Sequence, residues 1–489
     1  MSPPPRRLPP RRLIVGPFNR VEGDLEVTLD LRDDAVAEAR VTAPLYRGFE
    51  QILLGRPATD ALVIAPRICG ICSVSQSVAA ARALAQVSDA QMPANGRLVS
   101  DLILAGENAA DHLTHFVLFF TPDFARACYA GRPWFAAARR RFAATEGESP
   151  RALLPARARF LHLMGLLAGK WPHSLALQPG GVTKAVDPAE RVRLLAILAE
   201  FREALESIVF ADRLEAVTAL DSIAALECWS DAAAPDHGDF RLFLHIARDL
   251  GLDRLGRGPA RLASSGSFGL FQPGLWDIGG RVAPFDPAAV TEDVTSAWMT
   301  GTAPAAPFAG LTQPAPDKPD AYSWCKAPRL DGQVIEVGAL ARQVVDGHPL
   351  ARALIAADGG GSVRSRVVAR LLELARLIPA MVDWTRSLRP GEPFCLAPGA
   401  PMADGAAIGL VEAARGTLGH WLTAQDGRIN GYQIIAPTTW NFSPRDGAGT
   451  PGALEQALVG TPVHPGETTP VAVQHVVRSF DPCMVCTVH

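Results

Sequence analysis

Two Cys-x-x-Cys pairs lie near opposite ends of this 489-residue chain, Cys69 with Cys72 and Cys483 with Cys486. A short turn lets both thiolates of one pair point at the same ion, so two pairs offer four soft donors to one metal site. Ligands this far apart in sequence meet only if the fold brings the last residues of the chain beside an early loop. The pattern therefore predicts a closed fold with its C-terminal segment inside.

The cysteines alone suit structural zinc, an iron–sulfur cluster or a soft transition metal such as nickel. Structural zinc is the commonest of these, but zinc ribbons usually keep their pairs close in sequence. Here the first pair follows Pro66-Arg67, and the second follows Asp481-Pro482 and precedes the terminal His489. Each pair thus belongs to a longer pattern, which argues against a simple zinc knuckle.

Composition restricts the class of protein further. A formal net charge of −3 gives no basic surface for nucleic acid, and no apolar run reaches the ~20 residues that cross a bilayer. The first residues lack the apolar middle of a secretory signal, so we expect a cytoplasmic protein. Eight cysteines are too sparse for a disulfide framework. The four outside the pairs are expected to be small buried hydrophobic residues: Cys128, Cys228, Cys325 and Cys395.

Apolar periodicity predicts an α+β fold that is predominantly α-helical. Residues 25–31 alternate between apolar and polar and residues 36–41 return after a turn, which predicts a hairpin. Helical periodicity occurs in residues 75–86, 96–120, 188–210, 240–250 and 363–388. Because the cysteine pairs span the chain, we expect residues 13–489 to form a single domain and residues 1–12 a disordered tail.

Longer motifs surround both cysteine pairs, and further motifs lie between them. They read Asn19-Arg20-Val21-Glu22-Gly23, Arg47-Gly48-Phe49-Glu50, Arg67-Ile68-Cys69-Gly70-Ile71-Cys72, Asp111-His112, Gly169-Lys170-Trp171-Pro172-His173, Glu412-Ala413-Ala414-Arg415-Gly416, Pro437-Thr438-Thr439-Trp440-Asn441 and Asp481-Pro482-Cys483-Met484-Val485-Cys486-Thr487-Val488-His489. In these motifs the chain resembles the large subunits of nickel-iron hydrogenases. The resemblance implies their fold, a central bundle of long helices with small peripheral β-sheets.

The resemblance also implies a cofactor, a nickel-iron centre whose iron carries one carbon monoxide and two cyanides. By position, Cys69 and Cys483 would be terminal ligands of nickel, and Cys72 and Cys486 would bridge nickel and iron. Thiolates are soft donors that suit nickel. The implied reaction is heterolytic cleavage of H2, with a proton passing from Cys483 to the carboxylate of Glu22.

Further residues take roles from the same resemblance. Arg415, oriented by Asp111 and Asp481, would lie over the open metal position and donate to one cyanide, and Thr438 would donate to the other. A magnesium ion would be held by Glu50, the carbonyl of Ile434 and the imidazole of His489. Four histidines are instead expected to be structural: His112, His115, His173 and His420.

Two departures from the usual motif favour one branch of the family. Most members have a histidine four residues after the second cysteine of the first pair, where this chain has Gln76. That glutamine resembles the hydrogen-sensing branch, as does a chain that stops at His489. The expected function is therefore the large subunit of a regulatory, hydrogen-sensing hydrogenase of low turnover that signals to a histidine kinase.

Three other functions stay open. One is a respiratory uptake hydrogenase that feeds a quinone pool, another is a non-catalytic relative like the complex I subunit, and the last is a zinc-stabilised scaffold. Retention of all four paired cysteines argues against the non-catalytic relative. Only four scattered cysteines remain for other uses, so electrons would leave through an iron–sulfur small subunit. The two subunits would form an obligate heterodimer, either alone or paired into a dimer of heterodimers. Maturation proteins are implied by the diatomic ligands.

Overall fold

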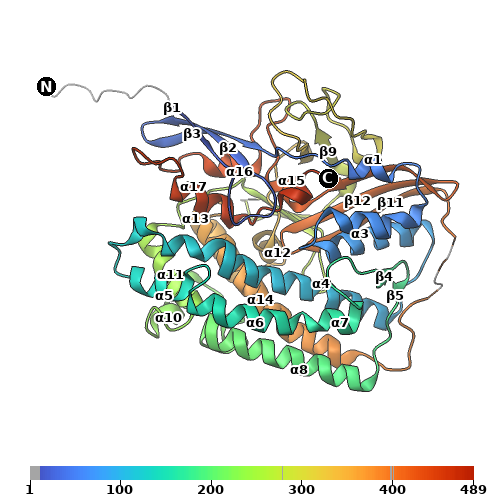
Figure 1. Cartoon of the computed structure of the whole chain (residues 1–489), viewed down its shortest axis with the longest axis horizontal. Coiled ribbons are helices and arrows are strands. Elements are labelled where there is room, and N and C mark those ends of the chain that lie inside the picture. The colour runs from blue at the N-terminus through green and yellow to red at the C-terminus, as the bar shows by residue number, and fades with distance from the viewer. Residues whose placement is uncertain (1–10, 278, 397–398, 400) are drawn as a thin grey trace.

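The protein is described by a computed structural model over residues 11–277, 279–396, 399 and 401–489. Long helices pack side by side through its centre (Figure 1), with α14 against both α4 and α8, and α6 against α8. These helices are α4 (Ala94–Thr114), α6 (Glu148–Phe160), α8 (Pro188–Ala204) and α14 (Val363–Ser387), with α7 (His162–Ala168) and α3 (Ser73–Val87) alongside α4. The expected helical bundle is confirmed.

Local sequence explains where the bundle helices begin. The side chain of Asp187 accepts a hydrogen bond from the backbone N–H of Glu190, and the side chain of Glu190 accepts one from the backbone N–H of Asp187. This capping box starts α8, with Pro188 in its first turn. Ser362 and Ser365 cap α14 in the same reciprocal way. Two predicted helices end as π-helical turns, at His115–Phe120 after α4 and Leu205–Phe210 after α8. The prediction missed α6, whose periodicity is interrupted by Pro155.

The predicted hairpin is present as β2 (Glu26–Arg32) and β3 (Ala35–Thr42). A third strand, β1 (Arg11–Val15), pairs antiparallel with β2. The predicted tail is therefore wrong at Arg11 and Arg12, and its residues 1–10 lie outside the described residues. The guanidinium of Arg12 bonds the carboxylate of Asp30 across the strands at 2.7 Å, and this cross-strand pair adds to the backbone pairing of β1 with β2.

A second antiparallel sheet, which the sequence did not predict, supports the first cysteine pair. It consists of β11 (Gly405–Ala413), β12 (Gly416–Gln425) and β13 (Arg428–Ile435), and α3 packs on β11. The approach is close at Gly409, where an added Cβ would lie 1.8 Å from the carbonyl oxygen of Ala79. Only glycine allows this contact, so the sheet fixes the position of the helix that follows Cys72.

The C-terminal segment runs inward and ends in the interior, close to α15 in Figure 1. His489 is 4% exposed, and the helices before it are α15 (Pro437–Asn441), α16 (Ala453–Leu458), α17 (Val471–Ser479) and α18 (Met484–Thr487). The remaining elements include α1 (Phe49–Leu53), α2 (Ala61–Ile64), α5 (Phe135–Phe142), α10 (Ile223–Asp231), α11 (Asp239–Leu250), α12 (Ala339–Val345), α13 (Pro349–Asp358), β6 (Arg261–Ser264), β7 (Gly274–Asp277), β9 (Val290–Asp293) and β10 (Ala327–Leu330).

Two sequence-based expectations concern the surface. Among the unpaired cysteines, only Cys325 is fully buried; Cys395 is partly exposed, and the prediction is wrong for Cys128 and Cys228, which are exposed. Both exposed thiols lie on short helical segments whose apolar faces are filled by neighbouring larger side chains such as Tyr129 and Leu226. No helix in the described part of the chain is long and apolar enough to cross a membrane.

Candidate functional site

The structure brings the four paired cysteines together in one buried cluster. Their sulfur atoms all lie within 4.8 Å of one another. Cys69 follows a 3-10 turn and Cys72 immediately precedes α3, whereas Cys483 immediately precedes α18 and Cys486 lies within it. Four cysteines on two short turns form a closed set of soft donors.

The proton affinities of these thiols fit a site that binds a cation. Hydrogen bonds from the other three thiols hold the pKa of Cys69 well below its usual value, whereas those same contacts raise the pKa of Cys72, and burial raises that of Cys486. Four adjacent negative charges in a buried space repel one another, so the bare cluster favours one thiolate. A bound metal supplies the positive charge that makes all four thiolates stable.

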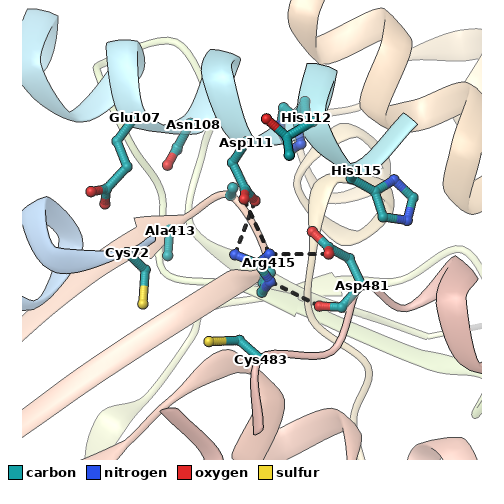
Figure 2. Close-up of polar contacts among 12 residues, drawn as sticks. Cys72, Glu107, Asn108, Asp111, His112, His115, Ala413, Arg415, Asp481 and Cys483 are labelled. Carbon is teal, nitrogen blue, oxygen red and sulfur yellow. Dashed lines mark hydrogen bonds and ion pairs between the residues drawn. The ribbon is translucent and has the colours of Figure 1, made fainter. Parts of the chain in front are cut away.

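Arg415 lies beside the cluster, on the tight turn between β11 and β12 (Figure 2). Its guanidinium contacts Asp111 of α4 at 3.0 Å and Asp481 at 3.0 Å, and its Nε donates to the backbone carbonyl of Asp481 at 2.9 Å. Figure 2 shows the sulfurs of Cys72 and Cys483 on the side of Arg415 that faces away from Asp111. Two carboxylates thus fix a planar cation over the thiol cluster.

The charges of this trio follow from burial and pairing. Burial opposes ionisation of Arg415, but the two carboxylates and the nearby thiolates raise its pKa well above the usual value. Burial raises the pKa of Asp111 to about 7, although Arg415 acts in the opposite direction. Burial acts to raise the pKa of Asp481, but Arg415 and further basic neighbours, Arg370 among them, together outweigh burial, and the pKa is lowered. Arg415 is therefore a permanent cation whose partners differ in proton affinity.

Glu22 approaches the cluster from the N-terminal motif. Burial and the charge of Cys69 raise the pKa of its half-buried carboxyl group, with Arg415 and Arg47 opposing. A carboxyl group with a raised pKa beside a thiol can exchange a proton with it near neutral pH. Its backbone also bridges that of Cys483, and this position together with the raised pKa suits Glu22 as a proton acceptor.

Two polar side chains from different elements also reach this region. The hydroxyl of Thr438, in α15, accepts a bond from the backbone N–H of Cys483 at 3.2 Å. The side-chain oxygen of Gln76 accepts a bond from Nε2 of His420 at 2.7 Å, and the hydroxyl of Tyr432 donates to Nδ1 of His420 at 2.7 Å. Burial lowers the pKa of His420 to about 3, which fits a neutral imidazole with this arrangement of donor and acceptor.

A second polar cluster is buried at the C-terminus. Glu50 accepts bonds from the backbone N–H of Ile434 at 2.8 Å and from Nε2 of His489 at 3.3 Å, and Thr312 also donates to it. The ammonium of Lys326 lies 3.5 Å from Glu50 and 2.8 Å from Glu292. The three residues expected to hold magnesium therefore meet, but a lysine is already present among them.

The second cluster holds one carboxylate oxygen that is open to a further ligand. Two carboxylates face one ammonium, and within the described residues Oε1 of Glu292 is buried without a hydrogen-bond partner. Burial opposes ionisation of Glu50, yet Lys326 and His489 lower its pKa to about 2. A buried carboxylate oxygen without a partner is the kind of hard donor that magnesium takes.

Comparison with known protein families shows which family has this fold and this site. The family model described as nickel-dependent hydrogenase matches residues 47–131 and 152–489. The chain belongs to the nickel-dependent hydrogenase family. This hydrogenase is 30% identical to the periplasmic [NiFeSe] hydrogenase large subunit of Desulfomicrobium baculatum, across 98% of this chain and 95% of that one.

Other relatives also match almost from end to end. The uptake hydrogenase large subunit of Afipia carboxidovorans is 27% identical, over 98% of this chain and 95% of its own. The hydrogenase-2 large chain of Escherichia coli K12 is 25% identical, over 98% and 97%. The solved Ni-Fe-Se hydrogenase of D. vulgaris Hildenborough superposes with a TM-score of 0.83 at 28% identity, covering 98% of this chain and all of that one. The fold and the enzymatic class expected from the sequence are confirmed.

The histidines expected to be structural in this hydrogenase all have protein partners. His112 pairs with Glu373 at 3.0 Å, His115 contacts the carbonyl of Arg478 at 2.7 Å, and His173 contacts that of Pro66 at 2.9 Å. None joins the metal-ligand group found among the described residues.

Sequence reasoning missed three residues near the hydrogenase site. Arg47 donates to the carbonyls of Ile68 and Val485 and so links the two cysteine turns. Lys326 carried no sequence signal. Glu107 did, because it precedes Asp111 by four residues on the same helix, which places two carboxylates on one helical face.

Proposed function

We propose that this hydrogenase large subunit oxidises H2 in an uptake role, with a nickel-iron centre held by its four paired cysteines. The observation that carries the proposal is the convergence of four buried cysteines beside a guanidinium fixed by two carboxylates. The uptake role rests on relatives that carry that name, such as the large subunit of Afipia carboxidovorans. Among the functions expected from the sequence, it has more support than sensing.

In this proposal each ligand has a distinct position. Cys69 and Cys483 would hold nickel, and Cys72 and Cys486 would hold both nickel and an iron that would carry carbon monoxide and two cyanides. The bound centre supplies the site of heterolytic H2 cleavage. Glu22 takes up the proton released at the sulfur of Cys483.

Two residues hold the environment of the centre. Arg415 keeps a positive charge beside the metals and excludes water from that side, because both of its carboxylate partners are buried. The hydroxyl of Thr438 accepts from the N–H of Cys483 and would donate its own proton to a cyanide. Magnesium at Glu50, the carbonyl of Ile434 and His489 would secure the C-terminus, with Glu292 balancing its charge.

The proposal includes an iron–sulfur small subunit. The chain's other four cysteines lie apart from one another and outside the one cysteine cluster of the described residues, so electrons need an acceptor on another chain. The large subunit purified alone should therefore fail to reduce dyes at the rate of the two-subunit complex. Equal rates with and without the partner would contradict this part of the proposal.

Gln76 supports hydrogen sensing as a second candidate. Its neutral amide is fully buried against the neutral imidazole of His420 near the site, where an ionisable side chain would allow proton exchange. Under this reading the protein would be cytoplasmic, turn over slowly and signal to a histidine kinase.

Infrared spectroscopy with metal analysis tests the site, on protein produced with its small subunit and maturation proteins. We expect one carbonyl band, two cyanide bands, and one nickel and one iron per chain. Stoichiometric zinc without these bands would overturn the proposal. Hydrogen-dependent dye reduction then separates the roles, because fast turnover supports uptake and slow turnover supports sensing.

A further inference from the structure

Helix α3 begins with a ligand in the position where a capping side chain normally lies. Its N-cap residue is Cys72, which makes no side-chain cap bond. The sulfur of Cys72 is instead directed into the cysteine cluster. The first N–H groups of a helix need acceptors when they are buried, so this helix requires a cap from elsewhere.

Glu107 provides that cap from the middle of α4. One oxygen of its carboxylate accepts from the backbone N–H and the hydroxyl of Ser75, at 2.9 and 3.0 Å. The other accepts from the backbone N–H of Val74 at 2.9 Å and from the indole N–H of Trp171 at 3.1 Å. Four donors thus converge on one carboxylate that is 3% exposed.

This geometry favours the ionised form of Glu107. Three of its four partners are N–H groups, which can only donate, and the fourth is the hydroxyl of Ser75, which can donate as well. A negative charge at the N-terminus of α3 is also favoured by the helix dipole. Burial acts against the charge and raises the pKa of Glu107 to about 7, with these hydrogen bonds opposing the increase.

Trp171 connects the cap to a second support of the same cysteine pair. In the loop of residues 169–173, the backbone N–H of His173 donates to the hydroxyl of Ser73 at 3.2 Å. The ring of His173 contacts the carbonyl of Pro66 at 2.9 Å. The loop therefore contacts the chain both before Cys69 and after Cys72.

We propose that Glu107 is a positioning residue for the metal centre, which caps α3 in place of Cys72 and so fixes the sulfur of Cys72 and the side chain of Gln76 relative to the metals. The link is short, because the backbone N–H of Gln76 bonds the carbonyl of Cys72 at 3.2 Å. The inference rests on the proposed function, since it assigns the bridging sulfur to Cys72.

Glu107→Gln is the main test, because it keeps the shape and replaces one accepting oxygen by a donating amide. That amide would face either the N–H of Ser75 or the N–H groups of Val74 and Trp171. We expect the variant to retain nickel and iron, to shift the carbonyl and cyanide bands beyond their line widths, and to lose about 10- to 100-fold in H2 oxidation. Glu107→Asp, which keeps the charge, should restore part of the rate.

Glu455→Gln is the matched control, since Glu455 is another buried carboxylate that accepts backbone N–H groups, here from Val41 and Gly452. It should leave the infrared bands in place. Amide hydrogen exchange in the metal-free protein gives an independent reading, with faster exchange expected in residues 73–77 of the Glu107→Gln variant only.

The outcomes separate the two proposals. Bands absent from the wild type would overturn the nickel-iron centre, whereas bands present in the wild type and unmoved in Glu107→Gln would overturn the positioning role alone. If Glu107→Gln yields no folded protein, Ser75→Ala and Trp171→Phe decide, since each removes side-chain donors to the same carboxylate. Unshifted bands in both would also overturn the role.

Discussion

Glu22 and Cys483 lie side by side as a parallel backbone bridge, although they come from opposite ends of the chain. The carbonyl of Glu22 accepts from the N–H of Met484 at 2.7 Å, and its own N–H faces the carbonyl of Pro482 at 3.5 Å. These contacts on either side of Cys483 fix the position of the proposed proton acceptor relative to the proposed proton donor. The two groups are held by backbone, so side-chain motion alone adjusts their separation.

Glu22→Gln should therefore remove proton transfer without disturbing the metals. An amide of the same size cannot take up a proton near neutral pH, and loss of a general base costs about 10²- to 10⁴-fold in rate. H2-dependent dye reduction should fall by this amount while nickel, iron and the infrared bands stay unchanged. Glu26→Gln, at the start of β2, is the control that should keep full activity; a Glu22→Gln enzyme as fast as this control would exclude Glu22 as the acceptor.

Arg415→Lys should weaken the enzyme more than a conservative change normally does. The lysine keeps the charge but cannot contact Asp111, the side chain of Asp481 and its carbonyl at once, as the guanidinium does. We expect kcat to fall by about 10²-fold or more, at the scale of one lost electrostatic contact to the reacting group, with little change in KM. Steady-state H2 oxidation measures both constants. An unchanged kcat would show that a positive charge at this position is sufficient for catalysis and that the shape of the guanidinium is not needed.

Gln76→His tests the choice between uptake and sensing. The introduced imidazole would lie against His420 and could titrate, which the amide cannot. Turnover or sensitivity to oxygen should rise, and both are measured by dye reduction before and after exposure to air. If neither changes, Gln76 is only a marker of ancestry.

Glu455→Gln should flatten the pH dependence of stability. Burial raises the pKa of Glu455 from 4.5 to about 7, so the folded protein holds this proton more tightly than the unfolded chain. Its contribution to stability is then fully present below about pH 4.5 and is lost as pH rises to about 7, by about 3 kcal/mol. Thermal unfolding across this range should show a smaller fall in Tm for the variant than for wild type. Equal slopes would contradict the raised pKa.

The sequence was informative wherever local chemistry determined structure. The alternating residues of β2 and β3 and the periodicity of α8 and α14 predicted those elements because each pattern reports one buried face. The cysteine pairs predicted the junction of the chain ends, since a four-ligand site has no other way to form. Motif resemblance then supplied Arg415 and Glu22.

Other features depended on contacts that no local pattern encodes. Strand β12 is buried along most of its length, so it lacks the alternation that marks a half-exposed strand. Lys326 meets Glu50 from 276 positions away, and Gln76 meets His420 from 344. Such pairings follow from the tertiary fold, which depends on the whole sequence and not on any one segment.

Because the two cysteine turns meet at one site, a bound metal would also restrict the unfolded chain. Cys72 and Cys486 are separated by 414 positions, so a metal that binds both joins the chain into a ring. By the entropy that applies to a disulfide closing a loop of this size, the ring would disfavour unfolding by about 6 kcal/mol. A denatured chain that keeps its metals is thus more compact than a metal-free one, because its two cysteine turns stay close together during unfolding.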